Sequence, residues 1–201
     1  MREKIIHTAS ELFISYGFKS VTMDDIANKL GISKKTIYQH FDNKTKLVET
    51  TTSHMYETIS HGIDCICDLN KNPIEEVFEI KRFVMEHLKD EKSSPQYQLK
   101  KYYPKISTSL RAKYFDKMLC CVKENLEKGV KQKLYRDSIN KDFISRIYFN
   151  GITSLKDQEV FPLTSFSMNS LMELFIEYHL RGICTTEGLE VLNKQLNADQ
   201  K

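Results

Sequence analysis

The sequence predicts an all-α protein with a three-helix helix-turn-helix head at its N-terminus and a larger α-helical domain after it. Three observations predict this fold class. Apolar residues recur at helical spacing along nearly the whole chain, and no segment shows a convincing strand pattern. The four prolines all fall between the expected helices, as required of a residue that lacks a backbone N–H. With 40% hydrophobic residues and only seven glycines, the chain can bury a core.

The first two helices are marked by their apolar faces and their ends. Residues 5–16 place apolar side chains on one face of an amphipathic helix, which Gly17 can terminate. Thr22, followed three residues later by Asp25, is a close relative of the capping box. The pattern therefore predicts a second helix that begins after Thr22 and runs to Leu30.

A tight turn and a short third helix follow. Gly31 can take the left-handed conformation that ends the second helix, and Ser33 can cap the third. Ile37 and Phe41 are spaced to be buried on one face of this third helix. Ala27 is small where two crossing helices approach closely. Together these features predict a helix-turn-helix.

Helices are expected to continue to the C-terminus. A fourth is expected from Asn43 or Thr45 to about residue 69, and others over 73–90, 95–102, 104–134, 140–156, 167–184 and 186–196. We expect a helix-turn-helix domain over residues 1–46 and an α-helical domain over 47–201.

The excess positive charge lies in the N-terminal quarter of the chain. Residues 1–46 hold eight basic and five acidic side chains, whereas the other 155 residues hold 22 of each. This distribution favours an N-terminal contact with nucleic acid.

The sequence also indicates a compartment. No apolar run approaches the ~20 residues that span a bilayer, so no membrane partner is expected. An odd number of cysteines, with Cys120 and Cys121 adjacent, suits reduced thiols and a cytoplasmic protein better than a disulfide framework.

The third helix carries the groups that can read DNA. In a helix-turn-helix the second helix of the motif enters the major groove, and its N-terminal side chains contact base edges. Here those side chains are Ser33, Lys34, Lys35, Thr36, Tyr38, Gln39 and His40. Backbone N–H groups at the start of this helix also suit phosphate.

A family resemblance is carried by residues 17–47, which read GFKSVTMDDIANKLGISKKTIYQHFDNKTKL. This run closely resembles the N-terminal domain of the TetR family of bacterial repressors, over residues 1 to about 48. Its Ile-Tyr-x-His-Phe followed by Asn-Lys is specific among helix-turn-helix families. The resemblance implies a DNA-binding head and a C-terminal domain that dimerises and often binds a small effector. It thus implies a homodimer on a palindromic double-stranded operator.

The resemblance also assigns roles to individual residues. Thr22 is similar to the residue that caps the second helix and touches a phosphate, Tyr38 and His40 to phosphate contacts, and Lys44 to a lysine that clamps the backbone. Base or neighbouring phosphate contacts are implied for Ser33, Lys34, Lys35, Thr36 and Gln39. Many members carry a small residue where this chain has Lys35, so base specificity does not transfer. The alternative is that Lys34 and Lys35 are solvated charges, that Tyr38 is a core aromatic and that His40 packs or caps the helix.

The dimer interface is expected in segments 142–156 and 167–184, by analogy with the family's four-helix bundle across a two-fold axis. The expected interface residues are Phe143, Ile147, Leu171, Leu174, Phe175 and Tyr178. The alternative is that both segments are ordinary core helices.

An effector pocket would lie among the fifth to eighth helices. Its candidate lining residues are Phe83, His87, Tyr97, Tyr102, Tyr103, Tyr114, Phe115 and Phe149. Aromatic residues at helical spacing are also common in an ordinary core, and the sequence does not disclose a ligand.

Neither a metal nor a cofactor is expected. His61 and Cys65 share a helix face, but Cys67 points about 160° away from Cys65, and two ligands do not make a site. Thiol sensing is not favoured either.

The leading hypothesis is a repressor released by a small effector. The alternative is a DNA-binding regulator without an effector, controlled by a protein partner or by abundance. An enzyme is the least favoured, because no nucleophile–base pair or phosphate-binding glycine loop is recognisable.

Overall fold

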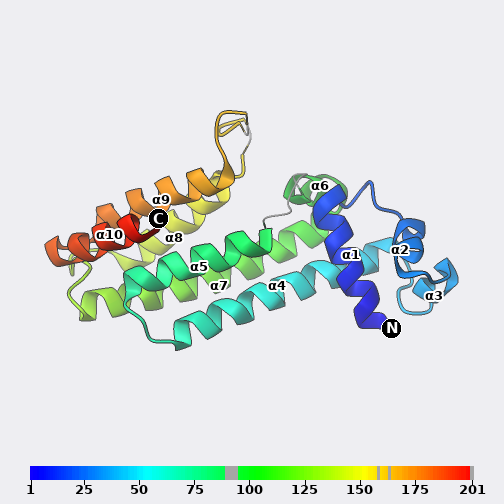
Figure 1. Cartoon of the computed structure of the whole chain (residues 1–201), viewed down its shortest axis with the longest axis horizontal. Helices are drawn as coiled ribbons and strands as arrows, with labels where there is room; N and C mark the ends of the chain where they lie inside the picture. Colours follow the sequence, from blue (N-terminus) through cyan, green and yellow to red (C-terminus); the bar gives the residue numbers. More distant parts are fainter. Residues whose placement is uncertain (89–94, 158, 163, 200–201) are drawn as a thin grey trace. The chain divides into compact units, whose positions relative to one another are not determined.

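The computed structural model describes residues 1–88, 95–157, 159–162 and 164–199, and these residues form the all-α fold that the sequence predicts (Figure 1). The helices are α1 (Arg2–Tyr16), α2 (Met23–Leu30), α3 (Lys34–Tyr38), α4 (Lys44–Asp68), α5 (Pro73–Leu88), α6 (Pro95–Tyr102), α7 (Pro104–Lys131), α8 (Lys141–Ser154), α9 (Met168–Ile183) and α10 (Thr186–Asp199). Within the described ranges no strand forms, and one isolated antiparallel bridge joins Tyr135 to Cys184. Of the helices described, none has the length and hydropathy needed to cross a membrane.

The helix ends follow local chemistry. Three of the prolines, Pro73, Pro95 and Pro104, stand at the first position of a helix, where the missing N–H costs nothing. The expected helix over 104–134 ends earlier, at Lys131, because Lys133 takes a positive φ of 60° and turns the chain. Residues 89 and 90, expected in the fifth helix, lie outside the described residues.

The chain forms two compact units. One comprises Met1–Gly62 and Glu86–Tyr114, and the other comprises Ile63–Met85 and Phe115–Lys201. Each unit has its own hydrophobic core. The first compact unit extends well beyond residue 46, where we expect the helix-turn-helix domain to end. That domain boundary therefore remains a prediction, based on function.

The core of the first unit joins helices that are distant in sequence. Side chains of α1 to α4 supply most of it, including Phe13, Ile26 and Ile37, which are fully buried. Leu99 of α6 is buried in the same cluster, and Tyr103 packs against it. The helix-turn-helix therefore rests on α6 and the start of α7, as well as on its own helices.

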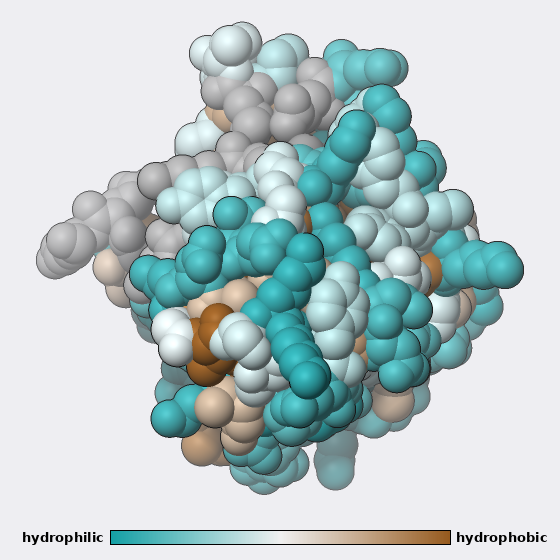
Figure 2. Space-filling model, turned by 90° about the vertical axis from the view of Figure 1, so that its right-hand side faces the viewer, coloured by the Kyte–Doolittle hydropathy of each residue, from teal (hydrophilic) through white to brown (hydrophobic). Residues whose placement is uncertain are grey.

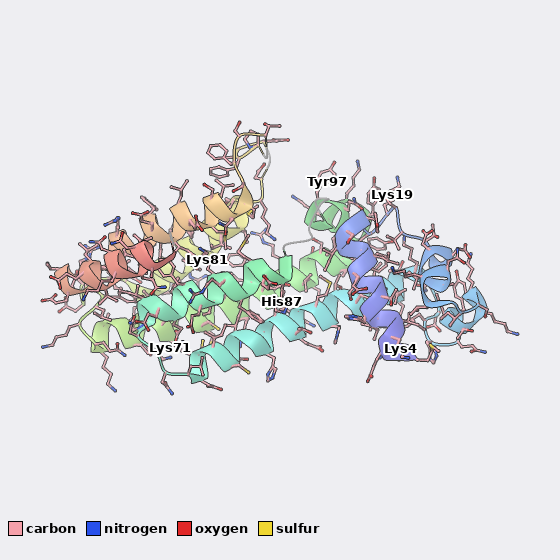
Figure 3. The ribbon with its side chains drawn as sticks, in the orientation of Figure 1. Lys4, Lys19, Lys71, Lys81, His87 and Tyr97 are labelled. Atoms are coloured by element: carbon pink, nitrogen blue, oxygen red, sulfur yellow. The ribbon has the colours of Figure 1, made fainter. Side chains whose placement is uncertain are left out.

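The core of the second unit contains a buried polar network. The carboxylate of Glu76 accepts hydrogen bonds from Asn125 (2.8 Å) and from Lys128 (2.8 Å). Tyr135 donates to the Asn125 side chain (3.1 Å), so these buried polar groups satisfy one another. Lys81, labelled on α5 in Figure 3, is buried. Its ammonium pairs with Glu173 of α9 at 3.1 Å.

Candidate nucleic-acid interface

A reciprocal hydrogen-bonded cap opens α2, as the sequence predicts. The Thr22 hydroxyl accepts from the backbone N–H of Asp25 (3.1 Å), and the Asp25 carboxylate accepts from the Thr22 backbone N–H (2.7 Å). The same hydroxyl donates to that carboxylate (2.8 Å). These bonds lower the pKa of Asp25, because they favour its charged form. The Thr22 hydroxyl hydrogen is thus engaged, and a phosphate contact by it would require exchange of this bond.

The turn between α2 and α3 depends on Gly31. Its backbone is left-handed, with φ 65° and ψ 32°, and its N–H bonds carbonyls at the end of α2. A side chain at this position would meet no neighbouring atom, so backbone strain alone favours glycine here.

Ser33 caps α3 as predicted. Its hydroxyl accepts from the Thr36 backbone N–H (3.1 Å) and lies 2.9 Å from the Thr36 hydroxyl. The two hydroxyls therefore pair with each other at the start of the helix. A helix of five residues has little intrinsic stability. The bonds of the Ser33 cap therefore help to hold α3 in place.

Lys34 is held by an acidic residue of the preceding helix. Its ammonium lies 2.8 Å from the Asp24 carboxylate, and both side chains are about half exposed. The hydrogen bond from Lys34 to Asp24 raises the pKa of Lys34. An exposed pair of this kind contributes little to stability, because solvent screens it. A phosphate can therefore compete with Asp24 for Lys34.

The remaining predicted contact residues lie on the surface of α3 and just beyond it. Lys35 and Tyr38 are exposed, Tyr38 by 45%. α3 ends at Tyr38, so Gln39 and His40, both exposed, lie in the turn that follows it. Tyr38 is not a core aromatic, whereas its neighbour Ile37 is fully buried. The side of the first unit that carries α2 and α3 faces the viewer in Figure 2, and the surface there is largely hydrophilic.

Lys44 stands at the first position of α4 and is partly buried. Its ammonium donates to the backbone carbonyl of Lys19 (3.2 Å), in the loop between α1 and α2. Burial lowers its pKa, and the Asp25 charge opposes that effect. The bond to Lys19 uses one of three ammonium hydrogens and fixes the direction of the other two.

Two residues expected in an effector pocket contact the head: Tyr102, the last residue of α6, and Tyr103, which lies between α6 and α7. The Lys19 ammonium lies 4.6 Å from the Tyr102 ring centroid and bonds its hydroxyl at 3.4 Å. The Tyr103 ring packs edge-on against Phe18, with centroids 6.5 Å apart. Figure 3 shows Lys19 beside α6, the helix that carries Tyr97. Helical periodicity gave no signal for this packing.

The other effector candidates occupy both compact units. Phe115 and Phe149 meet edge to face, with ring centroids 5.0 Å apart, in the second unit. Phe83 is half-buried in that unit, and His87 is exposed in the first. Tyr114 contacts Tyr56 at 5.1 Å in the first unit. The predicted lining residues are therefore divided between the two units.

The predicted dimer residues divide by burial. Leu171 is buried, and Phe175 packs on Tyr148 of α8 with ring centroids 5.6 Å apart, so Phe175 holds α9 against α8. The other four are exposed, by 58%, 47%, 56% and 78% respectively, and we call them the α8–α9 stripe: Phe143, Ile147, Leu174 and Tyr178. Each helix presents its pair at a spacing of four residues, hence on one face.

Sequence reasoning missed the partners of the predicted contacts. Asp24 pairs with Lys34, and the Lys19 carbonyl accepts from Lys44. Asp24 and Lys34 lie ten residues apart, on either side of the turn, and their opposite charges are the one sequence signal for this pair. Across the described ranges, no three His, Cys, Asp or Glu side chains are grouped to hold a metal ion.

The family model matches the N-terminal segment, whereas the matches to individual proteins range from a third of the chain to most of it. Residues 5–51 match the family of bacterial regulatory proteins called tetR family. The chain is 35% identical over 63 residues to IcaR, the HTH-type negative transcriptional regulator of the icaADBC biofilm operon of Staphylococcus aureus. That match covers 31% of this chain and 34% of IcaR, so it spans about a third of this relative's length. This chain is also 24% identical to YerO, an uncharacterised HTH-type transcriptional regulator of Bacillus subtilis, in a match that covers 79% of this chain and 60% of YerO.

Solved structures share the fold over nearly the whole chain. A transcriptional regulator from Saccharomonospora viridis, in complex with choline, superposes with a TM-score of 0.77 at 21% identity, covering 92% of this chain and 97% of that one. A TetR-family regulator from Agrobacterium tumefaciens superposes with a TM-score of 0.73 at 18% identity, over the same shares. At these identities the likeness establishes the all-α fold.

Proposed function

Because its N-terminal residues belong to the TetR family of bacterial regulatory proteins, we propose that this chain is a sequence-specific transcriptional regulator that binds DNA as a homodimer. The observation that carries the proposal is the short, capped helix α3. It presents Lys35 and Tyr38 to solvent while Ile37 anchors it in the core. A rigidly anchored helix with exposed polar groups is what major-groove recognition requires.

The polar groups of the head divide between two kinds of contact. Lys35 and Gln39 are exposed near α3 and can bond base edges in the major groove. Tyr38, Lys44 and Lys34 are suited to phosphates, which position the protein on DNA without reading sequence. For Lys34, the phosphate competes with Asp24. The caps of α2 and α3 use the hydroxyls of Thr22, Ser33 and Thr36, and His40 lies in the turn after α3. For these four residues a phosphate contact is a second role.

A second copy of the chain would cover the α8–α9 stripe. Exposed aliphatic and aromatic side chains clustered on two packed helices mark an interaction surface. A symmetric dimer pairs this surface with itself and presents two heads to half-sites about 34–36 Å apart. Leu171 and Phe175 belong to the support beneath the surface.

Repression relieved by a small effector is the proposed mode of regulation. The edge-to-face pair of Phe115 and Phe149, with the Arg146 guanidinium 5.6 Å from the Phe115 ring centroid, is the aromatic cluster that supports an effector site in the second unit. The similar Saccharomonospora viridis protein was solved with choline, which supports small-molecule binding by this fold. Control by a protein partner or by abundance is the alternative, and an enzyme is disfavoured because the curated relatives are regulators.

Selection from a randomised duplex library tests the proposal. The full-length protein is titrated against the library at low and at physiological salt, and the retained DNA is sequenced. We expect a palindrome whose half-sites are about one helical turn apart. Failure to enrich any sequence with a folded dimer would overturn the proposed function. Recovery of a single, non-palindromic site would overturn its dimeric form.

A further inference from the structure

A glutamine of α6 binds the loop between α1 and α2. The side-chain oxygen of Gln98 accepts a hydrogen bond from the backbone N–H of Lys19 at 3.0 Å. The two residues are 79 positions apart in the sequence, and both belong to the first compact unit. Gln98 is half-buried, and Lys19 lies beside its helix in Figure 3. The bond therefore ties α6 to the loop that leads into the helix-turn-helix.

The close approach of Gln98 depends on a glycine in the loop. Gly17 has a positive φ of 84° and is buried. A Cβ atom at this position would overlap the side-chain amide of Gln98. The loop backbone and the Gln98 amide are thus packed directly against each other, which restricts the geometry of the bond to Lys19.

The backbone of Lys19 is bound on both sides. Its N–H donates to Gln98, and its carbonyl accepts from the Lys44 ammonium at 3.2 Å. Its side chain is held as well, since the ammonium lies 4.6 Å from the Tyr102 ring centroid. Only the φ and ψ of Lys19 separate its N–H from its carbonyl. Fixing the N–H from α6 therefore limits the directions in which the carbonyl can point.

The Lys44 ammonium depends on that carbonyl. Lys44 is half-buried, and burial lowers its pKa while the Asp25 charge opposes that effect. A partly buried cation needs hydrogen-bond acceptors in place of the water that it has lost. If the Lys19 carbonyl turned away, the ammonium would lose an acceptor and would turn toward solvent.

We propose that Gln98 is a positioning residue for DNA binding, which fixes the backbone of Lys19 so that its carbonyl directs the Lys44 ammonium toward a phosphate. The proposal rests on the phosphate contact proposed above for Lys44. Gln98 acts through Lys19 and touches no DNA itself. It adds a side chain of α6 to the residues on which the DNA contact depends.

The first test needs no DNA. Nitrogen-15 NMR titration of the lysine ammonium groups in the full-length protein compares the parent with Gln98→Leu, which removes the acceptor. We expect the pKa of Lys44 to rise toward the ordinary lysine value, because the released ammonium returns to water. A Lys44 pKa equal to that of the parent would overturn the proposal.

The second test counts phosphate contacts. Lys44→Gln should reduce the slope of log affinity against log salt by about 0.9, and we expect Gln98→Leu to reduce it equally. The double variant should show the same reduction, because both changes remove one contact. A reduction of about 1.8 in the double variant would mean two independent contacts and would overturn the proposal. An unchanged slope in Gln98→Leu alone would also overturn it.

The matched control is Gln195→Leu, the same change at a half-buried residue of α10 in the second unit. It should alter neither the Lys44 pKa nor the salt slope. Circular dichroism confirms that each variant folds, and a loss of folded protein alone lowers binding at all salt concentrations without changing the slope. If Lys44→Gln leaves the slope unchanged, the proposed phosphate contact is wrong and the role of Gln98 in DNA binding falls with it. An unchanged slope in Gln98→Leu beside a reduced one in Lys44→Gln refutes the positioning alone.

Discussion

The α2–α3 surface and the α8–α9 stripe expose side chains of opposite chemistry. On the first, exposed groups are polar and many are already paired: Thr22 with Asp25, Ser33 with Thr36, and Lys34 with Asp24. On the second, four large apolar side chains face solvent. On a surface whose polar groups bond one another, these groups keep hydrogen-bond partners when a ligand dissociates. A surface with uncovered apolar area gains stability only when another surface covers it, so the two regions are suited to transient and lasting contacts respectively.

The largest expected effect comes from the stripe. We expect Leu174→Glu to convert the dimer into a monomer, because it places a charge in the centre of an apolar contact. Loss of the second head should weaken operator binding by about 10²–10⁴-fold. Sedimentation and DNA titration measure the two effects. Leu69→Glu is the matched control, since Leu69 is 60% exposed outside the stripe, and an equal loss in that variant would contradict the assignment.

The next effect tests where the head ends. Leu99→Ala removes a side chain that is 4% exposed, in the core shared with α1 to α4. We expect it to destabilise the protein by about 2–5 kcal/mol in denaturant unfolding. Amide exchange should rise in α2 and α3, although the substitution lies far away in sequence. Lys100→Ala, on the exposed neighbour, should change stability by less than about 0.5 kcal/mol. If amide exchange in α2 and α3 stayed unchanged, α6 would not contribute to the stability of the head.

Base reading gives a smaller effect that depends on sequence. Lys35→Ala and Gln39→Ala should each lower discrimination at particular operator positions, by about 1–3 kcal/mol for each hydrogen-bonded base that the side chain no longer reaches. Binding to a panel of single-base operator variants measures this. A uniform loss across the panel would assign both residues to phosphate instead.

Phosphate contacts give the complementary pattern. Tyr38→Phe and Lys44→Gln should weaken binding to all duplexes alike. Because Lys44→Gln also removes a positive charge from a phosphate, it should reduce the slope of log affinity against log salt by about 0.9. Lys46→Gln is the control, because Lys46 pairs with Glu49 (2.7 Å) on the exposed side of α4. A salt slope that Lys44→Gln leaves unchanged would remove Lys44 from the interface.

The smallest effect concerns Asp24. We expect Asp24→Asn to strengthen binding to non-specific DNA slightly, because Lys34 loses its internal partner. Titration against a random duplex at several salt concentrations measures it. Weaker non-specific binding would show that Asp24 is needed to position Lys34.

Local signals predicted much of the head. The spacing of Thr22 and Asp25, the glycine at position 31 and the serine at position 33 each determine backbone geometry within a few residues, and the structure has both caps and the turn. The order of the helices followed in the same way from apolar periodicity and proline positions. Such signals act over one helical turn, so they apply before any tertiary contact is known.

What could not be predicted depends on pairing between distant helices. Periodicity indicates that Tyr103 and Leu99 face a core, but not which core, and both pack against the head. The exposed four of the six predicted dimer residues could not be told from the inner two, because both sets repeat with the helical period.

If Lys34 binds phosphate as proposed, its bond to Asp24 has a consequence for how the protein searches a chromosome. Every non-operator site would have to displace a carboxylate before it gained that lysine, so each brief stop on random DNA would yield one fewer released counterion. Shorter stops would mean faster sampling of successive sites. On the operator, the proposed base contacts would hold α3 in place, so the exchange would be made once and retained. A single acidic side chain at the edge of α2 would thus favour rapid scanning over adhesion to bulk DNA.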